Sequence, residues 1–280
     1  MFAIADDEQR PTLMGILNVT PDSFSDGGQY LQLEAACVAA ERMVADGADI
    51  IDIGGESTRP GAPAVDAETQ IARVLPVVRT LRQALPERVL LSVDTRSAKV
   101  ADAVLSAGAR IINDVAAGRE AGMLDIVAAH GAGIILMHMQ GTPETMQQAP
   151  HYVDVVREVH EFLLGRAVAA QAAGIPRSAI ALDPGIGFGK SRAHNLALLG
   201  ALGELAAGDY AVLLGTSRKR FMGAICSETN PAELLGATCA TTALAVEAGV
   251  RIVRVHDVKA NRQAADVAWA IQQQRRRGDH

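Results

Sequence analysis

Two carboxylates in this sequence end buried apolar runs in the same way. Asp94 closes the run LLSVD and Asp183 closes the run AIALD, while the amide of Asn113 closes a third run, IIN. Acceptors at such fixed positions can bind a flat heterocycle that carries several N–H donors, and Lys219 and the amide can donate to its carbonyl and ring nitrogens. Paired carboxylates also occur in glycosidases, but those enzymes rarely need the cations that accompany them in this chain.

Cationic side chains gather in two other motifs. GTSRKR contains Ser217, Arg218 and Lys219. RIVRVHD contains Arg254 and His256, whose i, i+2 spacing places them on one face of a strand. The chain has a net charge of −6, so cations collected at one place favour an anionic ligand there. Alternatively, some of these cations pair with neighbouring carboxylates, as we expect most for the arginines of GTSRKR.

The stretch LDPGIGFGKS, residues 182–191, looks at its end like a phosphate-binding loop. That loop requires the pattern G-x-x-x-x-G-K-[ST], which places its first glycine at position 184. Pro184 stands there instead and has no N–H to offer a phosphate. The carboxylate of Asp183 would also repel phosphate, so the sequence argues against a nucleotide loop. A metal hydrolase is disfavoured too, because the first apolar run ends in NVT without an H-x-H ligand pair.

Short apolar runs recur along the chain, and helical segments separate them. The eight runs span residues 13–19, 50–55, 90–95, 111–115, 134–139, 179–185, 211–217 and 251–257. Each run is continuous rather than alternating, which is typical of strands buried on both faces of a parallel sheet. Eight strand–helix units predict a (β/α)8 TIM barrel that forms a single domain over residues 1–280. A doubly wound open sheet is the alternative fold.

The barrel prediction places the unusual polar residues together. Alanine-rich helical segments end at Gly47, Gly108 and Gly249, where glycine is the usual helix stop. In such barrels the site lies at the carboxyl ends of the strands. The polar residues at those ends are Asn18, Glu56, Asp94, Asn113, His138, Asp183, Lys219, Arg254 and His256. We expect Thr95 and Asp114 to act instead as local caps or turn formers.

Two of the connections are unusually long. The first strand is followed by TPDSFSDGGQYLQ and the second by ESTRPGAPAVDA. Ordinary strand-to-helix loops have roughly 2–6 residues. Long loops over a barrel mouth are usually lids or binding loops. The alternative is that both are plain surface excursions.

Bulk composition excludes several classes of protein. The net charge of −6 argues against a partner such as nucleic acid, and no apolar run approaches the roughly 18 residues of a membrane span. The N-terminus has no apolar signal core. Cys37, Cys226 and Cys239 are far apart and form neither a disulfide framework nor a metal pattern. We therefore expect a cytoplasmic enzyme.

Several motifs together resemble those of the dihydropteroate synthases, in the same order, over residues 13–260. The motifs are MGILNVTPDSFSDGG, DIGGESTRPGA, SVDT, IIND, LMHMQG, LDPGIGFGK, GTSRKRFMG and IVRVHDVK. The resemblance implies that 6-hydroxymethyl-7,8-dihydropterin diphosphate condenses with 4-aminobenzoate in folate biosynthesis. The products are 7,8-dihydropteroate and diphosphate. It also implies Mg²⁺ as cofactor and a homodimer.

The resemblance further implies a role for each matching residue. The pterin positions correspond to Asp94, Asn113, Met137, Asp183 and Lys219. The diphosphate and metal positions correspond to Asn18, which would hold Mg²⁺, and to Arg59, Arg254 and His256. The aminobenzoate positions correspond to Thr58, Arg59, Pro60, Phe188, Ser217 and Lys219, and Phe24 and Asp26 of the first long loop would complete that pocket.

The residue types suit this reaction. The expected catalytic groups are Asp94, Lys219, Arg254 and His256. The reaction needs no protein nucleophile, because the enzyme has to stabilise the departing diphosphate and the cation that forms on the pterin. Asp183 would hold the N–H groups of the pterin, and Phe188 would form an apolar wall. The alternatives are a pterin-binding methyltransferase and an inactive paralogue of the same fold.

Overall fold

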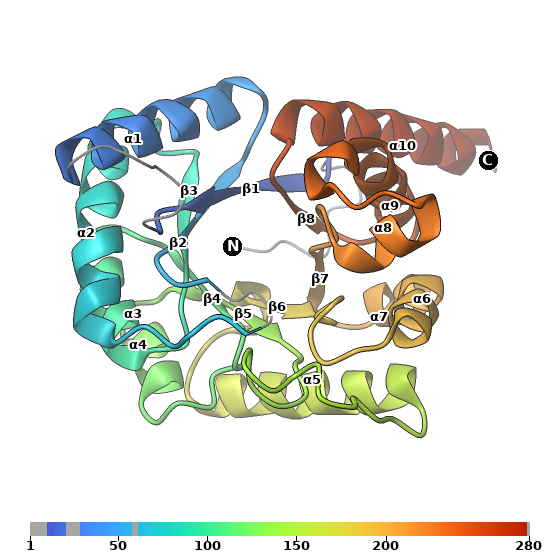
Figure 1. Cartoon of the computed structure of the whole chain (residues 1–280), viewed down its shortest axis with the longest axis horizontal. Helices are drawn as coiled ribbons and strands as arrows, with labels where there is room; N and C mark the ends of the chain where they lie inside the picture. Colours follow the sequence, from blue (N-terminus) through green and yellow to red (C-terminus); the bar gives the residue numbers. More distant parts are fainter. Residues whose placement is uncertain (1–9, 21–28, 58–60, 279–280) are drawn as a thin grey trace.

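The chain folds into a closed barrel of eight parallel strands. The computed structural model describes residues 10–20, 29–57 and 61–278. The strands pair in sequence order, and the first also pairs with the last, so the sheet has no edge (Figure 1). The strands are β1 Thr12–Asn18, β2 Ile50–Gly54, β3 Leu90–Asp94, β4 Ile111–Asp114, β5 Gly133–Met137, β6 Ile180–Asp183, β7 Ala211–Leu214 and β8 Ile252–Val255. The predicted TIM barrel is confirmed, and the doubly wound alternative is wrong.

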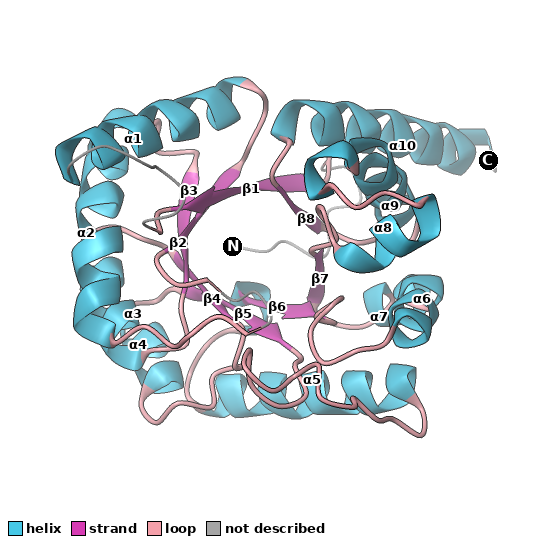
Figure 2. Ribbon diagram, viewed as in Figure 1, coloured by secondary structure: helices cyan, strands magenta, loops and turns pink. Residues whose placement is uncertain are grey.

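Helices surround the barrel on its outside, as Figure 2 shows by colour. The α-helices are α1 Gln29–Ala45, α2 Ala67–Ala84, α3 Ala98–Ser106, α4 Met123–Ala129, α5 Val155–Ala172, α6 Arg192–Gly200, α7 Leu202–Ala206, α8 Arg220–Cys226, α9 Leu235–Glu247 and α10 Val258–Gly278. Short 3-10 turns, η2 Arg177–Ala179 and η3 Pro231–Glu233, precede β6 and α9. Among the described residues, none of these helices is long and apolar enough to cross a membrane.

Several predicted local signals are confirmed. Gly47, Gly108 and Gly249 have φ values of +103°, +109° and +89°, the left-handed backbone that lets a helix end there. The carboxylate of Asp114 accepts hydrogen bonds from the backbone N–H groups of residues 116 and 118. The hydroxyl of Thr95 accepts one from the N–H of residue 97. Both residues therefore form local turns, as the sequence indicated.

The interior of the barrel changes from apolar to polar along its axis. Side chains alternate between the two faces of each strand, so every second residue of a strand points into the barrel and the others point toward the helices. One set packs outward against the helices, as Ile51 and Ile53 do. The other set fills the lower interior and comprises Met14, Ile50, Ile111, Ile135, Ala181, Ala211, Leu213 and Ile252. Above this layer Asp52 stands in register with Ser92, and then Asp94 with Asn113. The polar groups thus begin inside the barrel and continue to its mouth.

The two long connections after β1 and β2 are confirmed by the element bounds. The described end of the second loop is tied down by Glu56, which is buried. Its Oε1 accepts the N–H of Val65 at 2.9 Å and forms an ion pair with Arg96 at 3.1 Å. The amide of Gln70 donates to its Oε2 at 3.4 Å. Glu56 therefore anchors the base of this loop rather than facing a ligand.

Candidate active site

The predicted site residues that are described gather at the carboxyl ends of the strands or in the loops that follow. They are Asn18, Asp94, Asn113, Met137, Asp183, Phe188, Ser217, Lys219, Arg254 and His256. Direct contacts link several of these residues to one another, as the next paragraphs describe. The other predicted residues, Phe24, Asp26, Thr58, Arg59 and Pro60, lie outside the described residues.

Arg254 occupies the centre of this cluster. It projects from β8 into the barrel, where its Nε donates to Asp52 Oδ2 at 2.7 Å and its Nη2 donates to Asp94 Oδ2 at 2.9 Å. The possibility that some cations pair with carboxylates thus holds for Arg254 as well. The guanidinium links β8 to β2 and β3 across the interior.

Sequence reasoning missed Asp52. The residue lies in the apolar run IIDIG on β2 and is fully buried. Besides Arg254 it accepts a hydrogen bond from Asn113 Nδ2 at 3.0 Å. The signal that could have revealed it is period two: its neighbours Ile51 and Ile53 face the helices, so the aspartate between them must face the barrel interior.

Asp183 and Asp94 are both buried carboxylates with altered acidity. Asp183 accepts the backbone N–H of Gly185 at 2.7 Å. Burial raises the pKa of Asp183, while the Gly185 N–H and the charge of Lys219 oppose that shift. Burial also raises the pKa of Asp94 to about 7, against the opposing effect of Arg254 and with the charge of Asp52 raising it further. Both groups are strong acceptors when ionised.

Lys219 lies against an aromatic ring at the edge of the cluster. Its Nζ is 4.0 Å from the ring centroid of Phe188, which is cation–π geometry. Burial lowers the pKa of Lys219 to about 8, while Asp183 opposes the shift. Phe188 itself packs on a small apolar cluster that contains Met137 and Met139. A cation, a carboxylate and an apolar wall therefore adjoin one another.

The glycine-rich loop after β6 serves packing rather than phosphate binding. Gly185 has φ +65°, and a Cβ on it would lie 1.9 Å from the carbonyl oxygen of His138. Lys190 is buried, and its Nζ contacts His138 Nδ1 at 3.0 Å and the carbonyl of Phe188 at 2.9 Å. The lysine is thus engaged inside the protein, in agreement with the prediction against a nucleotide loop. The glycines let this loop pack against the segment after β5.

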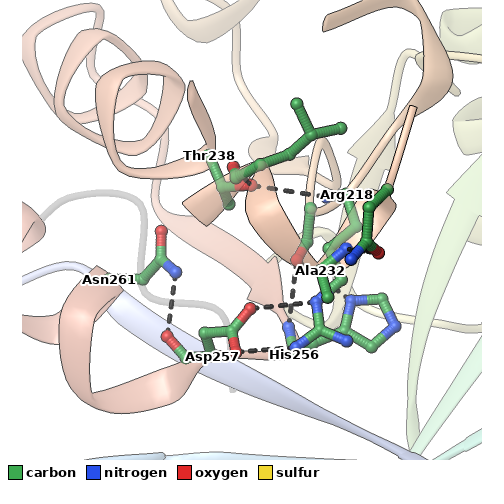
Figure 3. A network of polar contacts seen from close by, with 9 residues as sticks. Arg218, Ala232, Thr238, His256, Asp257 and Asn261 are labelled. Atoms are coloured by element: carbon green, nitrogen blue, oxygen red, sulfur yellow. Dashed lines mark hydrogen bonds and ion pairs between the residues drawn. The ribbon is translucent and has the colours of Figure 1, made fainter. Parts of the chain in front are cut away.

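Fewer side chains at the ends of β7 and β8 offer an unpaired positive charge than the sequence suggested. Arg218 forms a two-pronged ion pair with Asp257, at 2.7 and 3.0 Å (Figure 3). His256 Nδ1 lies 3.0 Å from Ser217 Oγ. Burial, followed by the charge of Arg254, lowers the pKa of His256 to about 3. The imidazole is therefore neutral at physiological pH, and Lys219 and Arg254 carry the positive charge here.

The described residues offer Mg²⁺ a small set of ligands. No group of three or more His, Cys, Asp or Glu residues that could hold a metal occurs within residues 10–20, 29–57 and 61–278. The amide oxygen of Asn18 stands at the mouth, 3.4 Å from where a Cβ on Gly54 would lie. Mg²⁺ typically keeps several waters and binds one or two protein oxygens together with substrate phosphates. A single amide oxygen at the barrel mouth fits this coordination habit.

Several known proteins are similar to this chain in sequence and in fold. The sequence model of the protein family described as pterin binding enzyme matches residues 14–256 of this chain. The dihydropteroate synthase of Escherichia coli strain K12 is 44% identical over 264 residues, which cover 94% of this chain and 93% of the relative. The Yersinia pestis dihydropteroate synthase, solved with a sulfonamide drug complex, is 43% identical with a TM-score of 0.89 and 96% coverage of both chains. The Xanthomonas albilineans dihydropteroate synthase, solved with 4-aminobenzoic acid, is 47% identical with a TM-score of 0.88, covering 94% of this chain and 93% of that one.

Proposed function

This chain belongs to the dihydropteroate synthases, a family of pterin-binding transferases, and from that premise we propose that its barrel mouth carries out their reaction. The substrates are 6-hydroxymethyl-7,8-dihydropterin diphosphate and 4-aminobenzoate, and the products are 7,8-dihydropteroate and diphosphate. The observation that carries the assignment to this mouth is the meeting of two buried carboxylates, an amide and two cations, which come from the ends of different strands and from the loop after β7.

The protein holds the pterin by matching acceptors to its N–H groups and a donor to its carbonyl group. Asp183 accepts from the amino and ring N–H groups, and Lys219 donates to the carbonyl. Asp94 and Asn113 face the same ring from β3 and β4. Phe188 supplies the apolar wall, next to the cation that it contacts.

The reaction breaks the bond between the pterin methylene carbon and a diphosphate oxygen, and it forms a bond from that carbon to the amine nitrogen. That nitrogen then releases one proton to water. The positive charge on the pterin is stabilised by the carboxylate of Asp94. Arg254 and a neutral N–H of His256 stabilise the departing diphosphate. Asn18 would hold Mg²⁺, which supplies further positive charge to the diphosphate when it is bound. Ser217 and Phe188 would line the side where 4-aminobenzoate binds.

Diphosphate release is the direct test of this function. The purified protein should release diphosphate from the dihydropterin substrate only when 4-aminobenzoate and Mg²⁺ are both present, and chelation by EDTA should abolish the release. A pterin-binding methyltransferase or an inactive paralogue would bind the pterin and release no diphosphate. The family relationship and the intact anion-binding residues favour the synthase.

Pterin affinity should be greatest between about pH 7 and pH 8. As the pH falls through about 7, Asp94 gains a proton and loses its charge as an acceptor. As the pH rises through about 8, Lys219 loses the proton that it donates. Calorimetry with 6-hydroxymethylpterin from pH 5.5 to 9.5 measures this profile. A matched variant, Lys219→Arg, should keep its charge and lose only the decline at high pH. Constant affinity from pH 6 to 9 would contradict the assignment of both groups.

We propose that the protein is a homodimer through the outer face of α9 and α10, which pack on each other. Their exposed apolar side chains include Leu235, Leu244, Val267 and Ile271. Contiguous exposed apolar surface on a soluble domain marks an interaction site. Figure 1 places this face on the other side of the barrel from α5.

Val267→Glu should therefore convert a dimer into a monomer, as sedimentation velocity would measure. Val267 is 60% exposed, and Val168 on α5 is 63% exposed, so Val168→Glu is a matched control. The control should sediment like the unmodified protein. Dissociation by both variants, or by neither, would exclude this face.

The chain's three cysteines, Cys37, Cys226 and Cys239, are free. Free thiols persist in a reducing compartment. This supports the cytoplasm as the compartment that we propose for the enzyme. Its partners are then the two small substrates rather than a nucleic acid, which its negative charge would repel.

A further inference from the structure

Asp52 is a charged residue that the mechanism above does not use. Its side chain is 0% exposed and lies one inner layer below Gly54 at the end of β2. A ligand at the mouth cannot touch it directly. Any role in the reaction must therefore pass through the residues that it contacts.

Stability alone does not explain a carboxylate at this depth. Moving an ionised group out of water costs several kcal/mol, and replacing buried ion pairs by apolar residues is often neutral or stabilising. A cluster of buried apolar side chains, which includes Ile50 on the same strand, lies below Asp52 in the barrel interior. An apolar residue at position 52 would extend that cluster.

The contacts of Asp52 converge on two groups of the active site, one assigned to the diphosphate and one to the pterin. Its Oδ2 accepts from Arg254 Nε at 2.7 Å and from Asn113 Nδ2 at 3.0 Å. Asp94 holds Nη2 of the same guanidinium at 2.9 Å. Two fixed nitrogens define the plane of the guanidinium, and Nη1 is the nitrogen that these two carboxylates leave for a ligand.

The amide of Asn113 is oriented by the same atom. An ionised carboxylate can only accept hydrogen bonds, so the part of the amide that faces Asp52 must be its NH2 group. The amide oxygen is then directed away from Asp52. Asp52 therefore decides whether Asn113 presents an acceptor or a donor to a heterocycle.

We propose that Asp52 is a positioning residue of the active site. It fixes the guanidinium of Arg254, which is assigned to the diphosphate, and the amide of Asn113, which is assigned to the pterin, and so sets the hydrogen-bonding pattern that the mouth presents to the dihydropterin diphosphate. This inference rests on the proposed function and deepens it, because it names the group that selects the heterocycle.

Calorimetry with 6-hydroxymethylpterin in the presence of diphosphate tests the proposal on the full chain. Asp52→Ala should weaken binding by about 10- to 100-fold, since both partners lose their charged acceptor. Asp52→Asn should recover part of that loss, because one amide oxygen can still accept both bonds. Ser92→Ala is the matched control: Ser92 is the register partner of Asp52, is 0% exposed, and its Oγ has no hydrogen-bond partner among the described residues. The control should bind within about twofold of the unmodified protein.

A mutant cycle that combines Asp52 with both of its partners separates positioning from a general structural role. In a protein that already carries Arg254→Ala and Asn113→Ala, a further change at Asp52 should alter affinity by less than about twofold, because the groups that it orients are absent. Full additivity, unchanged affinity in a folded Asp52→Ala protein, or no recovery by Asp52→Asn would each overturn the proposal. If Asp52→Ala does not fold, the same cycle with Asp52→Asn decides. Failure of the unmodified protein to bind the pterin would instead overturn the proposed function.

Discussion

Asp183→Ala should weaken pterin binding by about 2–5 kcal/mol, which corresponds to roughly 30-fold to several thousand-fold in Kd. Asp183 is 6% exposed and ends β6 at the mouth. Its removal leaves N–H donors of the bound pterin unpaired in a buried place, which costs more than the loss of a hydrogen bond in water. Calorimetry with 6-hydroxymethylpterin measures the change.

Asp183→Asn is the control for this substitution. The asparagine has nearly the same volume and keeps one acceptor oxygen, so it should lose less affinity than alanine. A thermal melt must accompany both variants, because Asp183 also accepts the backbone N–H of Gly185 at 2.7 Å. Unchanged affinity in a folded Asp183→Ala protein would remove this residue from the pterin site.

Gly185→Ala should lower the free energy of unfolding by more than about 4 kcal/mol. Single substitutions reach this size only when they introduce a severe defect such as a steric overlap. A Cβ at this position would lie 1.9 Å from the carbonyl oxygen of His138, and that oxygen belongs to the backbone. Relief of this overlap requires the loop after β6 to separate from the segment after β5. Urea denaturation would measure the loss, and the displaced loop should also impair pterin binding through Asp183.

Gly131→Ala separates the overlap from the backbone conformation. Gly131 has φ +58°, close to the +65° of Gly185, but no atom lies within 4 Å of a Cβ built there. Its substitution should cost only the roughly 1–2 kcal/mol of a left-handed non-glycine residue. Equal destabilisation by the two variants would mean that the contact with His138 yields easily.

Much of the fold could be predicted because its signals are local. The apolar runs became strands since each is buried on both faces, and Gly47 and Gly108 ended helices because only the left-handed backbone permits that turn. The carboxyl-end position of Asp94 and Asp183 also followed from the order of the elements alone.

The rest of the site depends on closure of the barrel. Arg254 meets Asp52 across 202 residues of sequence, and no local pattern encodes that pair. His256 was counted among the cations, but burial beside Arg254 lowers its pKa to about 3. The role of Lys190 was equally hidden, because one of its acceptors lies on His138 in another loop and the other is the carbonyl of Phe188 in its own loop. The metal, the dimer and the roles of the individual site residues remain predictions.

The ion pairs of Arg254 have a consequence for the order of folding. They join the last strand to β2 and β3, so they form only when β8 has docked. Contacts this distant in sequence carry a large entropic cost of loop closure, so we expect them to form late in folding. A chain in which β8 is absent or undocked therefore lacks the arginine assigned to the diphosphate, and substrates or inhibitors that require it can stabilise only the closed barrel. Such ligands would protect the finished enzyme from unfolding without accelerating the steps that precede closure.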